Sequence, residues 1–567
     1  MMGRRAAGCA GLVVCLLLGS ARAQAPRYRV RVVEGVRECA QGIPQALDER
    51  GQVVGGRCLW NPAGLLPPPD EHHPDVFAQD LAGGVAVGHV VDDDRGFDTP
   101  MIWAGGQPQR LPLAPGFTQG LGLYINAHRD VLGQMSNNTA GTQTAIWPQA
   151  GAPSVVTLSP QAGNRDLRGF NDRQQIVGCA SFRNLFGGHI VPFLWSDGQT
   201  RVLEPSSSAD PSGCALAVND AGLVAGESDQ RPVLWRDGKL VRLAPPGLTG
   251  YAEAVNDQGA VIGVLDGRAF YSDGASLWDL RGLIDDAGQA AALGRFLAIN
   301  DAGQILANRP SPGGPFSGVA LLEPQAPRAG DAPPLVTMTS PWNGEPLVDL
   351  VTLQASASDD VAVAGVQFFA NGKPVGPEDT TAPYTAEVDA LEPASFHARA
   401  RDTAGNLTSS PLRFAVVSRS CQAARAGQAV TGAFAQQSRQ FTARFTILAT
   451  RFTEGGFALS SGTPGGFAAT SAAVLFAPDG EIKVRNGSAY AGTGVAYRPG
   501  IYHHFRLAVD VPARRYSVWL KLANQPERLL AAGQAFRVSA VTRLDHWMLR
   551  ADESSPADLT ACNVRVP

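Results

Sequence analysis

The chain has 567 residues, enough for three or four domains. Charged residues make up 17% and the formal net charge is −4, which argues against proteins that bind nucleic acid or anionic membranes through a basic surface. The 64 glycines and 41 prolines follow no collagen period. They are typical of many short strands joined by turns, so we expect an all-β protein.

Residues 1–23 have the features of a signal peptide. Arg4 and Arg5 provide the positive charge, Ala10–Leu18 form a short apolar core, and Ala21-Arg22-Ala23 is a small-x-small cleavage site. No later segment reaches about 18 apolar residues, so the mature chain is predicted to lack a membrane span. We expect an exported protein that stays in the periplasm, attaches to the cell surface or is released.

Residues 27–325 contain one phrase repeated seven times. The phrase is an Asn-Asp-x-Gly turn, an apolar strand that ends in glycine, and later an apolar-apolar-Trp. It is complete in Val218–Gly226 followed by Leu234-Trp235, while copy two is degenerate and the last copy lacks the aromatic residue. The closing positions lie a mean of about 42 residues apart, which suits a four-stranded propeller blade. These positions are Gly55, Gly88, Gly133, Gly178, Gly226, Gly263 and Ala307.

The landmarks of the repeat predict two hairpins per unit, because Asn and Gly tolerate the positive φ of tight turns. Seven units of four strands would form a β-propeller of about seven blades, with a six-bladed ring or an open array as alternatives. The turn position holds Asp48, Asp80, Asn126, Asn171, Asn219, Asn256 and Asn300, and the aromatic position holds Trp60, Trp103, Trp147, Trp195, Trp235 and Tyr271. The aromatic residues could stack on sugars and the Asn-Asp pairs could bind calcium. We favour wedges between blades and turn chemistry instead.

The co-occurrence of Asn-Asp-x-Gly and Leu-Trp in fixed order resembles the HAF-type extracellular repeat of bacterial secreted proteins. The resemblance implies an extracellular location and a repeat fold. It provides no catalytic motif to transfer to this chain.

The cysteines of the mature chain are even in number. Cys39, Cys58, Cys179, Cys214, Cys421 and Cys562 remain after the signal is removed, and six cysteines allow 15 pairings. Proximity favours the disulfides Cys39–Cys58 and Cys179–Cys214, and Cys421–Cys562 would join the ends of the last domain. The spacing of cysteines and histidines does not support a zinc site.

Residues 326–333 form a Pro/Ala linker, and residues 334–417 show period-two strands. The phrases 364–372, Ala382-Pro383-Tyr384 and 400–406 resemble bacterial Ig-like modules, whose role is usually that of a spacer. Calcium is the one cofactor we consider for this segment. Asp359, Asp360, Asp402 and Asn406 could gather at one end as oxygen ligands, although solvated turns are the favoured interpretation.

Residues 418–567 form the last predicted domain. The phrases Gly-x-Ile-x-Val-x-Asn-Gly (480–487) and Tyr-His-x-Phe-Arg-x-x-Val-Asp (502–510) are followed by Tyr516-Ser517-Val518-Trp519. This order resembles the concanavalin-like and laminin-G-like jelly-roll β-sandwich, which implies a curved sheet that can receive a glycan. The candidate ligand-binding residues are Asn486, Tyr490, Tyr497, His503, His504 and Arg537, and we assign Tyr502, Trp519 and Trp547 to core packing.

No familiar catalytic motif occurs in the chain, so we expect a protein that is not an enzyme and name no catalytic residues. The loop Glu71–Asp75 and Asp92–Asp94 are the densest possible metal ligands, and a solvated loop is the favoured interpretation. The sequence favours a binding or adhesion protein that recognises glycans or a cell-surface protein. The alternatives are a glycoside hydrolase or polysaccharide lyase with its site in the propeller, and a structural repeat protein without a small ligand.

Overall fold

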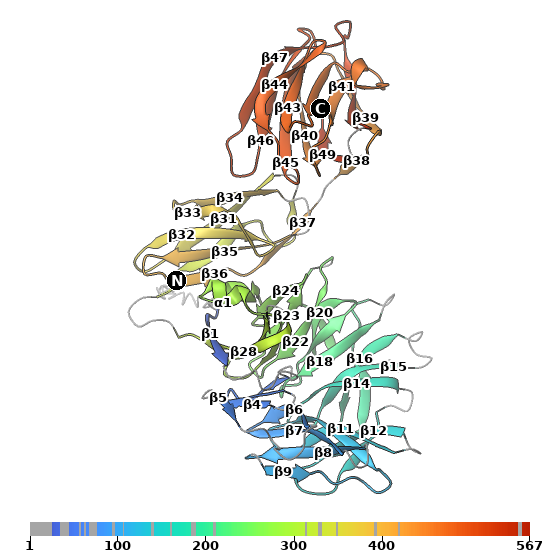
Figure 1. Cartoon of the computed structure of the whole chain (residues 1–567), viewed down its shortest axis with the longest axis vertical. Helices are drawn as coiled ribbons and strands as arrows, with labels where there is room; N and C mark the ends of the chain where they lie inside the picture. The colour runs from blue at the N-terminus through green and yellow to red at the C-terminus, as the bar shows by residue number, and fades with distance from the viewer. Residues whose placement is uncertain are drawn as a thin grey trace, which may run out of the picture.

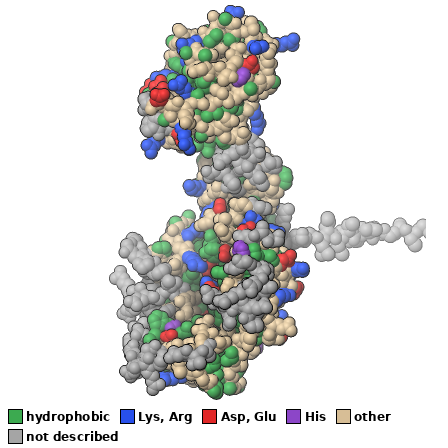
Figure 2. Space-filling model, turned by 90° about the vertical axis from the view of Figure 1, so that its right-hand side faces the viewer, with side chains coloured by type: hydrophobic (Ala, Val, Ile, Leu, Met, Phe, Trp, Pro, Cys, Tyr) green, Lys and Arg blue, Asp and Glu red, His purple; other side chains and the backbone are tan. Residues whose placement is uncertain are grey.

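The computed structural model describes residues 25–33, 45–55, 58–61, 64–66, 76–92, 97–105, 107–137, 141–158, 162–182, 189–207, 211–245, 247–311, 314–326, 332–347, 350–389, 394–417, 420–553 and 558–567. The predicted signal peptide, the Cys39–Cys58 disulfide and the possible metal ligands at 71–75 and 93–94 lie outside the described side chains. The described chain is all-β and stacks a blade array, an Ig-like module and a two-sheet sandwich along its long axis (Figure 1). Figure 2 shows this stack from the side, with basic and acidic side chains interspersed over the visible face.

Seven four-stranded antiparallel sheets occur among the described residues before position 325, one for each copy of the repeat. Blade 1 contains β2 (Ala46–Leu47), β3 (Val53–Gly55), β4 (Cys58–Asn61) and β5 (Gly64–Leu66), and blade 2 contains β6 (Val76–Ala82), β7 (Val85–Asp92), β8 (Phe97–Ala104) and β9 (Gln107–Arg110). Blade 3 contains β10 (Gln119–Ile125), β11 (Val131–Asn137), β12 (Gly141–Trp147) and β13 (Ser154–Val156), and blade 4 contains β14 (Ala162–Phe170), β15 (Ile176–Phe182), β16 (Ile190–Ser196) and β17 (Gln199–Val202).

The last three blades follow the same order, and a short 3-10 helix and a short α-helix join blade 6 to blade 7. Their elements are β18 (Gly213–Val218), β19 (Val224–Ser228), β20 (Arg231–Arg236) and β21 (Lys239–Arg242); β22 (Gly250–Val255), β23 (Val261–Leu265), β24 (Arg268–Ser272), β25 (Leu277–Asp279), η2 (Leu280–Leu283) and α1 (Ala287–Ala291); and β26 (Phe296–Ile299), β27 (Ile305–Ser311), β28 (Gly314–Pro324) and β1 (Tyr28–Val33).

The N-terminal strand closes the ring. β1 pairs antiparallel with β28, from Tyr28 opposite Pro324 to Val33 opposite Val319, and so becomes the fourth strand of blade 7. Blade 7 also bonds to blade 1, because Asn300 Nδ2 donates to the carbonyl of Asp48 at 2.9 Å. The array is therefore a closed propeller of seven blades, in which the first and last segments share one sheet.

The repeated Asn does more than close its own turn. Its Oδ1 accepts the backbone N–H four residues later, as Asn219 Oδ1 does from Leu223. Its Nδ2 donates to the backbone carbonyl of the equivalent residue in the next blade, in the steps Asn126 to Asn171, Asn171 to Asn219, Asn219 to Asn256, Asn256 to Asn300 and Asn300 to Asp48. These side chains are buried, so the asparagines form a hydrogen-bonded belt that links blade to blade.

The hydrogen bonds between blades differ where aspartate takes the place of the repeated asparagine. Asp48 Oδ2 accepts the N–H of Gly84 at 3.1 Å, and Asp80 Oδ2 accepts that of Ile125 at 2.9 Å. A carboxylate only accepts, so blades 1 to 3 are joined with the donor and acceptor roles reversed. Burial raises the pKa of Asp80 to about 6.

The repeated tryptophans fill the space between neighbouring blades, as the wedge interpretation predicts. Trp235 of blade 5 is fully buried in a cluster with Val177 and Leu203 of blade 4, and Trp147 of blade 3 packs with Val85 and Val87 of blade 2. Trp60 and Trp103 lie in equivalent clusters with the preceding blades, whereas Trp195 is half-buried. The four buried indoles, Trp60, Trp103, Trp147 and Trp235, stabilise the ring and offer no open stacking surface.

In blades 2 to 6 the closing glycine faces a β-bulge on the innermost strand. In blade 3 the register shifts between Gly122 and Tyr124, and a Cβ on Gly133 would lie 1.9 Å from the carbonyl oxygen of Leu121. The corresponding distance at Gly226 of blade 5, to the carbonyl oxygen of Cys214, is 2.2 Å. In these five blades the bulge brings the first strand too close for a Cβ, so glycine is needed there, whereas Ala307 occupies the equivalent position of blade 7.

The Ig-like module has a three-stranded and a six-stranded sheet around a core that includes Leu353, Phe368 and Phe396. The three-stranded sheet consists of β29 (Leu335–Ser340), β31 (Leu350–Ser358) and β34 (Tyr384–Asp389). The second sheet consists of β30 (Pro346–Leu347), β37 (Arg413–Val417), β35 (Ala394–Asp402), β32 (Val363–Ala370) and β33 (Lys373–Asp379), with β36 (Leu407–Ser409) paired to β35.

The Ig-like module bonds to both neighbours, which makes it more than a loose spacer. On the propeller side the N–H of Leu412 donates to the carbonyl of Leu277 at 2.7 Å, and Ser409 Oγ donates to the carbonyl of Gly282 at 2.8 Å. On the other side Lys521 Nζ pairs with Glu387 Oε2 at 2.6 Å. These contacts fix the order and spacing of the three parts.

The C-terminal sandwich packs two six-stranded antiparallel sheets, here called sheet K and sheet L, around a core that includes Phe445, Phe457 and Tyr516. Sheet K consists of β38 (Cys421–Ala424), β49 (Leu559–Arg565), β40 (Gln440–Ala449), β45 (Tyr502–Asp510), β46 (Arg515–Lys521) and β47 (Arg528–Ala535). Sheet L consists of β39 (Ala429–Gln437), β48 (Leu544–Ala551), β41 (Gly455–Ser460), β42 (Ala472–Phe476), β43 (Glu481–Asn486) and β44 (Ala489–Ala496), and η3 (Phe467–Ala469) lies between β41 and β42.

Two of the predicted disulfides are present. Cys179–Cys214 joins blades 4 and 5, and Cys421–Cys562 joins the first and last strands of the sandwich. Within the described ranges, no helix has the length and apolar character needed to cross a bilayer.

Candidate ligand-binding groove

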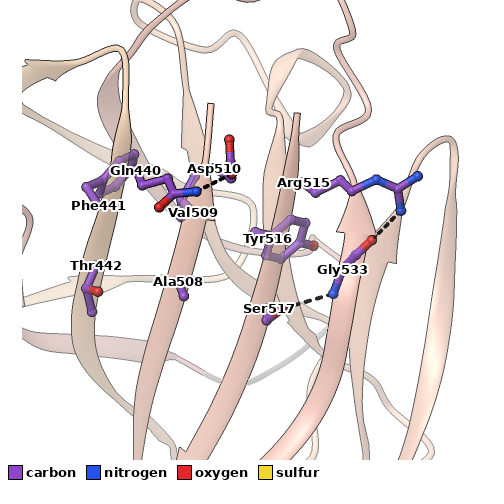
Figure 3. Close-up of a pocket in the computed structure, with 10 residues that line it drawn as sticks. All are labelled: Gln440, Phe441, Thr442, Ala508, Val509, Asp510, Arg515, Tyr516, Ser517 and Gly533. Carbon is purple, nitrogen blue, oxygen red and sulfur yellow. Dashed lines mark hydrogen bonds between the residues drawn. The ribbon is translucent and has the colours of Figure 1, made fainter. Parts of the chain in front are cut away.

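A groove lies on the outer face of sheet K, with a cavity volume of about 420 Å³ (Figure 3). Its floor has small side chains, Thr442 of β40, Ala508 of β45 and Ser517 of β46. Gln440 and Asp510 lie on one side, and Arg515 lies on the other beside Gly533 of β47. The groove therefore offers an amide, a carboxylate and a guanidinium above a floor that leaves room for a ligand.

Strict alternation along the strands creates this face. In β45 the residues Phe505, Leu507 and Val509 enter the core, so Arg506, Ala508 and Asp510 face outward. In β46 the side chains of Tyr516, Val518 and Leu520 enter the core. Arg515, Ser517 and Trp519 consequently share the outer face with the groove.

Hydrogen bonds hold the polar groups of the groove in place. Gln440 Nε2 donates to Asp510 Oδ2 at 2.5 Å, Arg515 Nη1 donates to the carbonyl of Gly533 at 2.9 Å, and the N–H of Gly533 donates to Ser517 Oγ at 2.9 Å. The pKa of Asp510 is lowered, first by the backbone N–H of Ala513 and then by the amide of Gln440. The carboxylate is therefore charged at neutral pH and ready to accept hydroxyl hydrogens.

An aromatic side chain extends the same face beyond the groove. The Arg506 guanidinium carbon lies 3.9 Å from the centroid of the Trp519 ring, and Arg506 pairs with Glu527 at 2.6 Å. Trp519 is half-buried on the outer face, so its predicted place in the core is wrong. The alternation with Tyr516 and Val518 is the sequence signal that places it outside. Trp547, by contrast, lies in the core as expected. Tyr502 is on the outer side of β45, so its predicted place in the core is also wrong, because the strand alternates and His503 takes the inward position.

The predicted ligand residues do not gather at one place. Tyr497 and His503 are each 1% exposed and lie at the core. The hydroxyl of Tyr497 accepts the N–H of Thr453 at 2.7 Å, and its ring packs edge-on against Phe476. Burial lowers the pKa of His503 to about 4, which favours the neutral imidazole. These two side chains have packing roles.

His504 lies at the contact between the sandwich and the Ig-like module. Its Nε2 pairs with Asp389 Oδ1, and its Nδ1 is 2.9 Å from Thr446 Oγ1. The opposite facing of His503 and His504 agrees with their expected alternation in a strand.

The remaining candidates lie around the hairpin from β43 to β44. Asn486 Oδ1 accepts the N–H of Ala535 at 3.0 Å, and Arg537 is exposed, with its backbone N–H bonded to the carbonyl of Ser471 at 3.0 Å. Tyr490 packs on Arg485, whose guanidinium carbon is 4.2 Å from the ring centroid. Arg485 is 2% exposed, whereas Tyr490 is half-buried.

The outer face of sheet L is closed around its middle strands. Ala458, Ala473 and Met548 follow one another across this face in register, and each is at most 1% exposed. This face provides no open surface at these three positions. The accessible groove described above lies on sheet K instead, and its lining residues were absent from our sequence-based selection.

The four calcium candidates of the Ig-like module do not form one ligand set. Asp402 accepts both the backbone N–H and the Nδ2 of Asn406, at 2.7 and 2.8 Å, and so closes its own turn. Asp359 Oδ2 accepts two backbone N–H groups, and Asp360 is exposed. Among the described residues, no group of three or more His, Cys, Asp and Glu side chains is arranged to hold a metal ion.

The innermost strands of blades 6 and 7 bring together a smaller polar cluster. Arg295 Nη2 lies 2.8 and 2.7 Å from the two carboxylate oxygens of Glu253, and its guanidinium carbon is 5.7 Å from the ring centroid of Tyr251. Burial raises the pKa of Glu227 in blade 5. Burial is also the main cause of the raised pKa of Tyr251, and the nearby charges of Glu253 and Glu227 add to it. Sequence reasoning missed this cluster because its members are spread along the chain, with 68 residues between the positions of Glu227 and Arg295.

Comparison with known proteins identifies one part of the chain. Residues 334–418 match the family described as Bacterial Ig domain. A search of curated proteins finds no match to the chain. Among solved structures, a fibronectin(III)-like module of Clostridium thermocellum CbhA has 29% identity and a TM-score of 0.14, with 15% of this chain and 94% of that chain covered.

Structures of Trypanosoma rangeli sialidase are also found. The complex with the inhibitor DANA has 10% identity and a TM-score of 0.27, with 85% of this chain and 90% of that chain covered. A mutant displaying trans-sialidase activity has 10% identity and a TM-score of 0.25, with coverage of 88% and 93%. At these scores the likeness carries no argument about activity. Residues 334–418 are thus a bacterial Ig domain within an all-β chain.

Proposed function

We propose that this chain is an extracytoplasmic binding protein that recognises glycans of a cell envelope or surface through the groove on sheet K. The bacterial Ig domain and the two disulfides indicate a location outside the cytoplasm. The propeller and the Ig domain hold the sandwich at the far end of the stack (Figure 1). His504, near the start of β45, contacts Asp389 of the Ig domain, whereas the groove lies at Ala508–Asp510, at the other end of the same strand.

The groove itself is the observation that supports this function. Asp510 and Gln440 face Arg515 across a floor of Thr442, Ala508 and Ser517. Sugar hydroxyls donate to carboxylates and accept from guanidinium groups, and small floor residues allow a ring to approach the sheet. The half-buried Trp519 on the same face adds apolar area next to these polar groups.

A glycan array with the full mature chain is the first test, followed by affinity measurements for the strongest ligand. We expect Arg515→Ala and Asp510→Asn each to weaken binding about tenfold, the equivalent of about 1.4 kcal/mol. Arg528→Ala is the matched control, because Arg528 is exposed on the same domain and outside the groove. If no glycan on the array binds while the full-length protein still binds cells, the partner is a protein and not a glycan.

The predicted residues Asn486, Tyr490 and Arg537 remain a second hypothesis for the same function. Asn486 and Arg537 are exposed near the β43–β44 hairpin. If Arg537→Ala weakens glycan binding and Arg515→Ala does not, this hairpin is the binding surface and the groove is not.

One observation favours an enzyme as the second candidate function. Glu227, Glu253, Tyr251 and Arg295 combine two carboxylates with an aromatic hydroxyl and a cation in neighbouring blades. Such a set could act on a glycosidic bond by general acid–base catalysis. Release of reducing ends from polysaccharides by the full chain, abolished by Glu253→Gln and by Glu227→Gln, would establish this activity.

A further inference from the structure

The contact between the propeller and the Ig domain covers a histidine that faces away from the core of its own domain. In β35 the residues Phe396 and Ala398 belong to the core of the Ig domain, so strand alternation turns His397 outward. His397 is nevertheless 2% exposed. A Cβ added to Gly282 of η2 would lie 3.4 Å from its Nε2, so the propeller covers this ring closely. Separation of the two domains would expose it to solvent.

The surroundings of His397 suit the neutral imidazole. Its ring stacks on that of Phe369, which lies opposite it in β32, with 4.6 Å between the ring centroids and an interplanar angle of 4°. Its Nδ1 is buried and has no hydrogen-bond partner among the described residues. A protonated imidazole carries an N–H donor on each nitrogen, and the donor on Nδ1 would have no described acceptor while the domains are docked.

The charges that face His397 come from both domains. Arg268 of β24 and Arg399 of β35 disfavour a further positive charge, whereas Asp279 of β25 favours it. Asp279 is already engaged, because its Oδ1 accepts the backbone N–H of Arg281 at 3.0 Å and its Oδ2 lies 3.6 Å from Arg268 Nη1. Burial is the largest effect, and it lowers the pKa of His397 to about 4.

Few polar contacts hold this boundary together. Among the described residues no ion pair crosses it, and the Arg281 guanidinium of η2 turns back to the carbonyl of Leu293 within the propeller, at 2.7 Å. The hydrogen bonds that cross the boundary include those from the Leu412 N–H to the Leu277 carbonyl at 2.7 Å, from Ser409 Oγ to the Gly282 carbonyl at 2.8 Å, and from Arg268 Nη2 to Ser395 Oγ.

We propose that acid releases the Ig domain from the propeller, with His397 as the group whose protonation drives the release. The exposed imidazole binds a proton near its ordinary pKa of 6.5, and the docked one only near 4. Between these values each fall of one pH unit therefore favours the undocked form about tenfold. The sandwich is attached to the Ig domain and would move with it, so the reach of the chain would depend on pH.

Hydrogen exchange of the Leu412 amide in the full mature chain measures this opening, because the N–H is bonded across the boundary. We correct the rate for the intrinsic pH dependence of amide exchange. Between pH 6.5 and pH 4.5 the protection of this amide should fall about 100-fold. The amides of β31, inside the Ig domain, are the internal reference and should keep their protection.

Variants of single histidines identify the titrating group. His397→Gln keeps a neutral polar side chain and should remove the pH-dependent loss of protection at Leu412. His397→Asn serves in its place if the glutamine variant does not fold. His504→Gln is the matched control, because His504 lies at the other junction, beside Asp389, and this variant should lose protection at Leu412 as the parent does.

A disulfide across the boundary separates undocking from unfolding of the Ig domain. A Cβ on Gly282 would lie 3.6 Å from Ser409 Oγ, so cysteines at these two positions are close enough to be linked. The linked protein should keep the protection of Leu412 at pH 4.5. Gly282→Ala with Ser409→Ala, which cannot be linked, should lose protection as the pH falls, as the parent does.

Three results would overturn the proposal. The first is protection at Leu412 that falls equally in the parent and in His397→Gln, or that does not fall in the parent. The second is a loss of protection in the linked protein as large as that in the parent. The third is a pH effect that His504→Gln abolishes, which would assign it to the junction with the sandwich.

Discussion

The asparagine belt predicts a large and local cost when one link is removed. Asn219 is 5% exposed, its Oδ1 accepts the N–H of Leu223 at 2.8 Å, and its Nδ2 donates to the carbonyl of Asn256 at 2.9 Å. Asn219→Ala would leave the Leu223 N–H buried without a partner and would remove the link to blade 6, although the Asn256 carbonyl keeps its bond from the Gly259 N–H. An unsatisfied buried group costs about 1–3 kcal/mol, so we expect a loss of that size in the stability of the propeller.

A second substitution separates the two halves of the link. Asn219→Asp keeps an acceptor for Leu223 and replaces the donor with a carboxylate that faces the Asn256 carbonyl. Blade 1 tolerates Asp48 because the next blade presents the N–H of Gly84 to it, whereas the group of blade 6 that meets Asn219 Nδ2 is the Asn256 carbonyl, which can only accept. We therefore expect the aspartate variant to be destabilised at neutral pH through the contact between blades alone.

Urea unfolding followed by tryptophan fluorescence measures the loss, and hydrogen exchange of the Leu223 and Ala260 amides locates it. Arg236→Ala, at the exposed turn between β20 and β21 of the same blade, is the control and should change stability by less than about 0.5 kcal/mol. The reasoning is refuted if Asn219→Ala costs less than about 1 kcal/mol, or if the aspartate variant is as stable as the parent.

Three further predictions concern other parts of the structure. Gly133→Ala should lower stability by more than about 3 kcal/mol or prevent folding, because the new Cβ would meet the Leu121 carbonyl at 1.9 Å. Gly105→Ala, in an open turn, is the control and should fold. Expression and thermal melting of the two variants test this difference. Replacement of Cys421 and Cys562 by serine should destabilise the sandwich by about 2–5 kcal/mol, because the disulfide closes a loop with a sequence separation of 141, and an unchanged melting temperature would contradict this. Burial lowers the pKa of His397 to about 4, below the ordinary 6.5. Between these two values the unfolded chain binds a proton at His397 that the folded state does not bind. The free energy of unfolding should therefore decrease as pH falls from about 6.5 towards 4. The melting temperature of His397→Gln should depend less on pH across this range than that of the parent. If the melting temperature of the variant falls as steeply as that of the parent, the effect belongs to other groups.

Local sequence signals were enough to predict the repeat and its blades. The Asn-Asp-x-Gly turn, the closing glycine and the tryptophan each have a short-range or nearest-neighbour role, so their spacing of about 42 residues predicted a four-stranded unit. The disulfides Cys179–Cys214 and Cys421–Cys562 followed from proximity in the repeat and from the ends of the last domain. The Ig-like segment was also evident from its strand phrases.

Tertiary structure decided where the accessible sites lie. The groove on sheet K joins Gln440, Asp510 and Arg515, which belong to three different strands. It also decided that β1 completes blade 7, because this pairing joins residues about 290 positions apart. Aromatic residues and histidines attract attention in a sequence, but Tyr497 and His503 are buried and Trp519 faces outward. The reason is physical: composition describes what a side chain is able to do, whereas the packing of sheets determines which side chains meet each other and which meet solvent.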